Sequence, residues 1–148
     1  MDKPTHLSKL IFEGFRLEEV IFKGNTSFSF ARPVPVDYDI RKGIVDQGTD
    51  KASAIVAIEC DIFTGQPLEQ VPFHLRLRAI GSFRIEAAED ISPELRCALL
   101  NQNAPAILFP FVRASIASII AAVNYPPVIM PVLNINHVKS LDSEITEE

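Results

Sequence analysis

The sequence AILFPFVRASIASIIAAV occupies residues 106–123 and is predicted to form one helix. A surface helix usually has one apolar stripe and a charged opposite face. Here large apolar side chains extend most of the way around the helix, diluted only by alanine and serine, and Arg113 is the only formal charge between Cys97 and Val138. Such a helix must be covered on nearly all sides, so we expect its own sheet on one face and a larger core, a membrane or another subunit on the other.

A membrane-spanning helix fits this stretch poorly. A span needs about 20 apolar residues, whereas this stretch is shorter, contains Pro110 and carries Arg113 near its middle. An arginine at the bilayer centre costs ~2.5–3.5 kcal/mol even on the gentler insertion scale. The polar start, Met1 to Lys9, also lacks the apolar region of a signal peptide. We therefore expect a cytoplasmic protein with no membrane insertion.

Composition indicates one globular domain, residues 1–148, with residues 1–8 and 139–148 as flexible tails. The net charge of −5 argues against a nucleic-acid binder that relies on neutralising phosphates. Cys60 and Cys97 lie far apart in apolar surroundings. That pattern is typical of reduced thiols in a cytoplasmic protein rather than of a disulfide framework.

A strand is predicted from Leu10, but its apolar alternation changes phase. The pair Phe15 and Leu17 shares a face with Val20 and Phe22 only if one residue is inserted between the pairs, which predicts a bulge at Glu18-Glu19. Residues 27–44 are predicted to be an edge strand or an extended crossover, because Pro33 and Pro35 cannot donate to a sheet ladder.

Two further strands are predicted before any helix. The first spans residues 52–63, and the second alternates strictly from Val71 to Ala87, with an apolar face and a basic face and a bend at Gly81. A short helix should follow, capped by Ser92 and ending near Leu100, with residues 101–103 breaking it before the long helix. A kink is expected at Pro110. Asn124 and two prolines should end the long helix.

Catalytic and metal-binding patterns are missing from the sequence. His6, His74 and His137 have no ligand spacing to one another or to a cysteine, and neither a phosphate-binding loop, a dinucleotide fingerprint nor a Gly-x-Ser-x-Gly elbow occurs. Glu18 and Glu19 are a poor candidate for a catalytic carboxylate pair, because adjacent side chains on a strand point to opposite faces. The basic face of the last strand could hold an anion, although a solvated face is the simpler interpretation. We expect no enzyme, no metal and no cofactor.

The helix resembles a known family. Asn103 to Arg113 (NAPAILFPFVR), followed by Ile116, resembles the start of the long helix in the SecB family of protein-export chaperones. Residues 81–85 (GSFRI) resemble the strand end that precedes the helices in that family, and residues 20–22 resemble its first strand. Residues 126–134 resemble its apolar, proline-rich segment after the helix, so the resemblance covers about Leu10 to Val138.

This resemblance implies an α+β fold in which the long C-terminal helix packs on one face of a four-stranded antiparallel sheet. Subunits would pair by sheet edges, and dimers would stack through their long helices into a homotetramer. It implies an ATP-independent chaperone that holds unfolded polypeptide clients in apolar grooves, where burial stabilises the complex by ~25 cal/mol per Å² without requiring a particular sequence. The expected subunit interface comprises Ile107, Phe111, Arg113, Ser115, Ile116, Ile119 and Ile120.

Candidate client-binding residues lie on irregular, proline-rich segments, whose apolar side chains cannot all be buried in regular layers. Alternatively, these residues complete the core. They are Phe28, Phe30, Val34, Val36, Tyr38, Val128, Ile129, Met130, Val132 and Leu133.

Partner docking can also be compared with the family. Export-type members present acidic side chains from the sheet to the SecA motor, and the matching positions here are Glu19, Lys23 and Arg76. Lys23 and Arg76 have the opposite charge to the acidic residues of the export-type members. A reversed charge repels the docking partner rather than merely weakening the attraction. This argues against export-type docking to SecA and favours, as a variant, a SecB-like chaperone that protects an antitoxin in a toxin–antitoxin system.

Two alternatives from other classes remain at this point. A hot-dog-type thioesterase also wraps a sheet around an apolar helix, but there the helix comes before most strands, and here it follows them all. A structural oligomerisation subunit would use the same apolar grooves as interfaces to one fixed partner.

Overall fold

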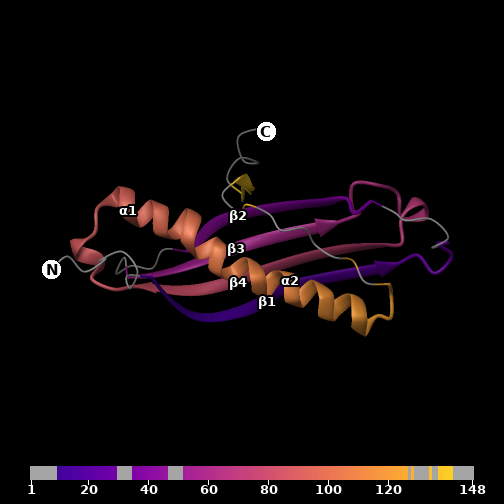
Figure 1. Cartoon of the computed structure of the whole chain (residues 1–148), viewed down its shortest axis with the longest axis horizontal. Helices are drawn as coiled ribbons and strands as arrows, with labels where there is room; N and C mark the ends of the chain where they lie inside the picture. The colour runs from indigo at the N-terminus through magenta and orange to yellow at the C-terminus, as the bar shows by residue number, and fades with distance from the viewer. Residues whose placement is uncertain are drawn as a thin grey trace.

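The computed structural model describes residues 10–29, 35–46, 52–126, 128, 134 and 137–141. Within these residues, five strands form one sheet in the order β1-β4-β3-β2-β5 (Figure 1). The four long strands are antiparallel neighbours: β1 (Leu10–Gly24), β2 (Tyr38–Asp46), β3 (Ser53–Ile62) and β4 (Phe73–Ile85). The α+β fold predicted from sequence is therefore confirmed, with one additional short strand.

Strand β1 contains the predicted bulge. Its register with β4 shifts between Leu17 and Glu19, where the apolar alternation changes phase, and a second shift occurs between Phe12 and Gly14. Each shift inserts one residue into β1. As a result, the apolar residues before and after each shift lie on the same side of the sheet, opposite inward-facing residues of β4. The β1 side chains on this face are Leu10, Phe12, Phe15, Leu17, Val20 and Phe22.

Strand β4 has the predicted apolar and basic faces. Its odd-numbered residues from Phe73 to Ile85 are buried, while Arg76, Ser82 and Arg84 are exposed on the other face. Gly81 lies under the long helix, where an added Cβ would come within 2.9 Å of Phe83 and 3.0 Å of Leu108. Glycine at this position therefore allows the helix to approach the sheet closely.

The helical region is continuous, which corrects one prediction. Ser92 caps α1 (Pro93–Ala98), and its Oγ accepts a hydrogen bond from the Leu95 amide at 3.1 Å, as expected for this cap. The expected break at residues 101–103 is wrong, because a π-helical turn, Leu99–Asn103, joins α1 directly to α2 (Ala104–Ala122). Asn124 adopts a left-handed conformation (φ 64°) and ends the helix.

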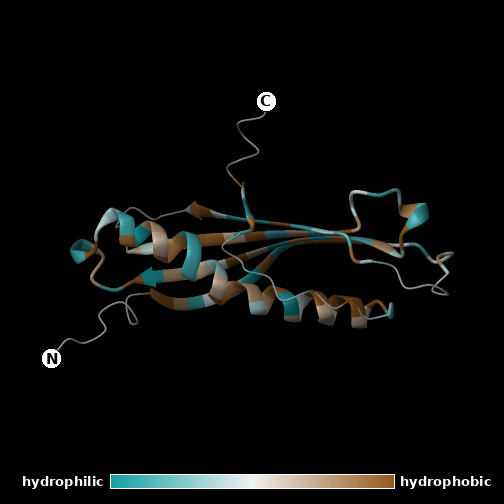
Figure 2. Ribbon diagram, turned by 45° about the horizontal axis from the view of Figure 1, so that its top comes forward, coloured by the Kyte–Doolittle hydropathy of each residue, from teal (hydrophilic) through white to brown (hydrophobic). Residues whose placement is uncertain are grey.

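The helices cover one face of the sheet, and α2 crosses the strands obliquely (Figures 1 and 2). No element within the described residues covers the other face, which we call the open face. The core lies between α2 and the central strands β3 and β4, where fully buried side chains each contribute about 1.5–3 kcal/mol. They include Ile58, Ile62, Leu75, Leu77, Phe83, Leu108, Val112 and Ile116.

The end of the chain differs from the expected tail. Lys139 and Ser140 form β5, which pairs parallel with β2 at Arg41 and Lys42. The sheet therefore has a fifth strand, and residues 139–140 belong to the folded domain. Strand β2, like β1, is an outer one of the four long strands, in agreement with the edge position predicted for its segment.

Candidate functional site

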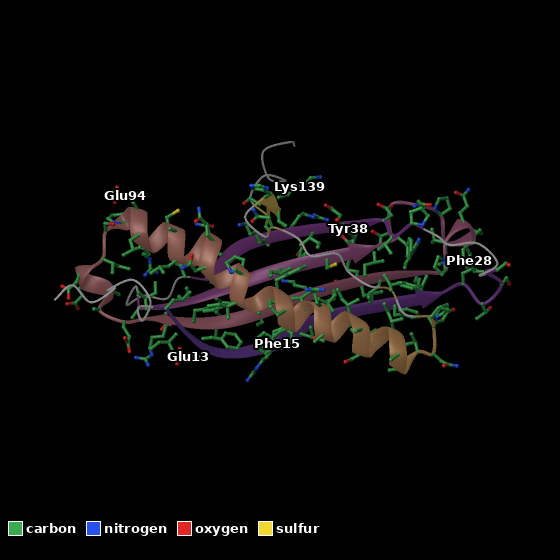
Figure 3. The ribbon with its side chains drawn as sticks, in the orientation of Figure 1. Glu13, Phe15, Phe28, Tyr38, Glu94 and Lys139 are labelled. Atoms are coloured by element: carbon green, nitrogen blue, oxygen red, sulfur yellow. The ribbon has the colours of Figure 1, made fainter. Side chains whose placement is uncertain are left out.

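An apolar surface lies where β1 meets α2. Phe111 of α2 packs on Phe12 and Phe15 of β1, with ring centroids 5.2 and 5.5 Å apart, and Figure 3 shows Phe15 beside the helix. Apart from Ile21, which belongs to the open face of β1, four large side chains on these two elements remain exposed, at fractions of 37–42%. We call them the β1–α2 surface: Leu17, Val20, Ile107 and Phe111.

The residues expected at a subunit interface separate into two groups. Ile107 and Phe111 are exposed, and Arg113, Ser115 and Ile119 are half-buried. Ile116 and Ile120 have exposed fractions of only 1% because they pack into the chain's own core. This placement removes both from the expected interface, since a side chain turned toward its own sheet cannot contact another subunit.

Four of the ten expected client-binding residues lie within the described segments. Val36, Tyr38 and Val128 are half-buried and pack against the margin of the core, and Phe28 is half-buried. Val138, which was not among the expected residues, packs against the same core. The other six lie outside the described residues: Phe30, Val34, Ile129, Met130, Val132 and Leu133.

The open face carries a network of paired charges rather than an apolar surface. The side chain of Asp61 is only 8% exposed and accepts from Arg41 at 3.1 Å and from Arg76 at 2.9 Å. The hydrogen bond with Asp61 raises the pKa of Arg76 above its ordinary value. Arg78 bridges Glu18, at 2.9 Å, and Glu59, at 2.5 Å. These pairs lie around a hollow of about 320 Å³ on this face.

The three residues compared with the export-type docking positions all belong to the open face. Glu19 and Arg76 line the same hollow, and Lys23 lies further along β1, opposite His74. Because Arg76 is engaged with Asp61 and neighbouring acids are paired with arginines, this face presents both signs of charge. It therefore lacks the uniformly acidic character that would attract a basic partner.

A buried lysine joins the helices to β2. Lys42 lies on the helix side of the sheet, 9% exposed, and its Nζ donates to the Asn101 carbonyl at 2.6 Å. Asn101 belongs to the π turn, where the irregular backbone needs partners outside the helix. Burial lowers the pKa of Lys42 below its ordinary value of 10.5. This contact fixes the junction of α1 and α2 against β2.

Reactive groups are sparse. Among the residues that the structure describes, no cluster of three His, Cys, Asp or Glu side chains could hold a metal ion. Burial raises the pKa of Cys60 to about 12, with smaller contributions from Asp61 and Asp39, so this thiol is a poor nucleophile. Cys97 is exposed on α1.

Residues Pro93–Ala122 are long and apolar enough to cross a membrane by length and composition alone. In the most apolar 18-residue window, 39% is buried inside the chain. Because the core helix of a soluble protein passes the same test, this helix is weak evidence for a membrane span.

Comparisons with known proteins agree with this architecture. Residues 27–140 match the family described as SecB, preprotein translocase subunit SecB, over well above half of the chain. The chain belongs to the SecB family. The predicted family resemblance is therefore confirmed.

Two curated relatives and one solved structure extend the comparison. The chain is 32% identical over 89 residues to protein-export protein SecB of Anaplasma phagocytophilum, covering 60% of this chain and 56% of that relative. It is 38% identical over 77 residues to uncharacterized protein MJ0357 of Methanocaldococcus jannaschii, covering 52% and 48%. This SecB-family chain thus aligns with about half the length of each relative.

The solved structure is the Mycobacterium tuberculosis Rv1957 SecB-like chaperone in complex with a ChAD peptide from the Rv1956 HigA1 antitoxin. The two chains align with a TM-score of 0.64 and 15% identity, covering 84% of this chain and 91% of the other. At that identity the likeness establishes the shared fold.

Sequence reasoning missed part of the surface of this SecB-family chain. By register, Leu17 and Val20 lie on the same side of β1 as the core-facing Phe15 and Phe22, so their pattern predicts burial. They remain exposed because α2 covers only part of the sheet face. Ile21 and Val45 are also exposed: Ile21 lies opposite Arg76 on the open face, and Val45 lies at the register shift between Ile44 and Asp46.

Proposed function

We propose that this chain is an ATP-independent holdase that binds unfolded or non-native polypeptides and prevents their aggregation in the cytoplasm. The observation that carries the proposal is its membership of the SecB family, a family of chaperones. The exposed apolar residues of the β1–α2 surface and the half-buried side chains beside β2 support it, because both provide apolar area that folding leaves partly accessible.

Two kinds of apolar surface have separate roles in this proposal. Extended clients contact the half-buried residues Val36 and Tyr38 at the start of β2 and Val128 after α2, together with Phe28 and the proline-rich segments around them. Subunits associate through α2, where Ile107 and Phe111 are exposed and Phe111 lies beside β1, and build a dimer of dimers. The neighbouring exposed positions of α2 are mostly alanine and serine, and such small side chains allow a second helix to approach closely.

Light scattering tests the holdase activity directly. A chemically unfolded enzyme is diluted into buffer with this protein at increasing ratios, without nucleotide. We expect scattering to be suppressed near one assembly per client, for several unrelated clients. If no client responds, the holdase proposal is wrong, and suppression for one client alone favours a dedicated partner. Turnover of an acyl-CoA by the purified protein would instead favour a thioesterase.

The second candidate function is that of a chaperone dedicated to one antitoxin. The charge pattern of the open face favours this function over a role in protein export. Lys23 and Arg76 have the opposite charge to the export-type docking residues, and the acids nearby are already paired. The related Rv1957 chaperone was solved with an antitoxin peptide. We expect no measurable SecA binding by the wild-type chain in sedimentation. Gain of binding by a Lys23→Glu/Arg76→Glu variant would show that charge at these positions prevents docking.

A further inference from the structure

The outer edge of β2 is covered by a short piece of the same chain. Lys139 and Ser140 pair with Arg41 and Lys42, and Figure 3 shows Lys139 beyond β2. The described pairing involves only these two positions of a strand that extends over nine residues, Tyr38–Asp46. Within the described residues, no other strand pairs with this edge of β2, and an unpaired strand edge is a template for an extended chain.

Gly43 shows how closely this covering segment approaches β2. An added Cβ at Gly43 would lie 3.1 Å from the Cβ and 3.2 Å from a Cδ of Leu141. Before β5, Val138 packs against the core on the helix side of the sheet, whereas Gly43 belongs to the open face by register. Residues 138–141 therefore pass around the β2 edge and place an apolar side chain on each side of it.

The attachment is weak compared with the rest of the sheet. Both β5 side chains are exposed, and the ion pair between Lys139 Nζ and Asp39 Oδ1 is 3.9 Å long and exposed. An exposed pair of this kind contributes about 0–1 kcal/mol. Strand β3, by comparison, pairs with β2 at eight positions and with β4 at ten. The segment belongs to the part of the fold that opens at low free energy.

We propose that the β2 edge is an acceptor for one extended strand of a polypeptide client, and that residues 138–141 occupy it until the client displaces them. The inference rests on the proposed function and specifies how a client is bound. A client strand replaces the two-residue pairing with a longer backbone ladder and places one apolar side chain on each side of the sheet, where Val138 and Leu141 lie. Backbone pairing tolerates many sequences, and the two apolar positions select against very polar segments.

Two glycines allow a matched test. In Gly43→Val, the new side chain takes the space of Leu141 and releases the segment, while a β-branched residue suits a strand. Gly14→Val is the control, because an added Cβ at Gly14, on β1, has nothing within 4 Å. Truncation after Asn136 removes the segment completely. The probe is a fluorescein-labelled, reduced and carboxymethylated α-lactalbumin, which remains unfolded in buffer.

Fluorescence anisotropy measures the affinity of each protein for this probe. If the segment occupies the edge about nine-tenths of the time, truncation and Gly43→Val each lower the apparent Kd about tenfold, and Gly14→Val leaves it unchanged. Equal affinity of the truncated and full-length chains would overturn the inference while leaving the holdase proposal intact. Absence of binding by every protein would overturn the holdase proposal itself.

Hydrogen exchange gives a readout that does not depend on affinity. We expect amides of residues 41–43 to exchange faster after truncation and to be protected again when the unfolded probe is bound. Protection that is unaffected by truncation would contradict the pairing with β5. A truncated chain that binds the probe without renewed protection at these amides would show that clients bind elsewhere.

Discussion

At the scale of single residues, the two cysteines provide a direct check of burial. Cys60 lies in the core and Cys97 is exposed, so a thiol reagent at pH 8 should modify one thiol per folded chain and two per unfolded chain. Because folding raises the pKa of Cys60 from 9.0 to about 12, the unfolded chain releases this proton first, and stability falls between these pH values. Urea titrations of wild type and Cys60→Ala should diverge in this window. Rapid modification of both thiols in the folded chain would contradict the burial.

Lys42 should produce the opposite dependence on pH. Its lowered pKa means that, between that value and 10.5, the unfolded chain binds a proton that the folded chain does not. The free energy of unfolding contributed by this residue therefore rises with pH across the window. Urea unfolding of wild type and Lys42→Met, measured in steps up to pH 10.5, should show a difference that grows in favour of wild type. A difference in unfolding free energy that stays constant with pH would mean that burial does not lower the pKa of Lys42.

Asp61 is the acid on which the open-face network depends. Asp61→Asn keeps the shape but removes the charge that Arg41 and Arg76 share, and the Arg41 side chain is itself only 14% exposed. Hydrogen bonds to charged groups contribute ~1.5–3 kcal/mol each, reduced here because Arg76 is more than half exposed. We expect a loss of about 2 kcal/mol in urea unfolding. Glu13→Gln, which breaks an exposed 3.8 Å pair with Arg84, is the control and should change stability by less than about 0.5 kcal/mol.

At the scale of secondary-structure elements, Gly81 controls the distance between α2 and β4. Gly81→Val places carbon where Phe83 and Leu108 already lie within 3.0 Å, so the helix must move outward or the core must repack. Overpacking of this kind costs typically ~1–3 kcal/mol. Thermal unfolding should show the loss, and Leu108→Ala combined with Gly81→Val should destabilise by less than the sum of the two single variants, because the smaller side chain relieves the crowding. A Gly81→Val variant as stable as wild type would show that the contact is not tight.

The same elements show what could be predicted from sequence. The bulge near Glu18 and the two faces of β4 follow from alternation, because burial on one face fixes the register of a strand. The α1–α2 junction was mispredicted, because polar residues 101–103 resemble a break, whereas Lys42, far away in sequence, satisfies the Asn101 carbonyl. Strand β5 was missed since two exposed residues carry no periodic pattern. Such features depend on contacts between distant segments, which local patterns do not report.

At the scale of the whole molecule, one sheet and one helix layer cannot cover every apolar side chain. Helix α2 covers the central strands and leaves the β1–α2 surface exposed, together with its own outer side. Ile107 and Phe111 are therefore the large apolar side chains of this helix that still need a cover, because Ile116 and Ile120 are already covered by their own chain. If subunits associate through α2, these two side chains must supply much of the apolar contact.

Sedimentation of surface variants tests this association. Ile107→Ser and the double variant Ile107→Ser/Phe111→Ser should lower the sedimentation coefficient toward that of a 16.4 kDa monomer. Phe111 also packs on Phe12 and Phe15, so the single Ile107 variant separates loss of assembly from loss of stability. Val45→Ser is the matched control, because Val45 is even more exposed, at 49% against 37% for Ile107, but lies on β2. Folded variants that sediment like wild type would show that the outer side of α2 is not the subunit contact.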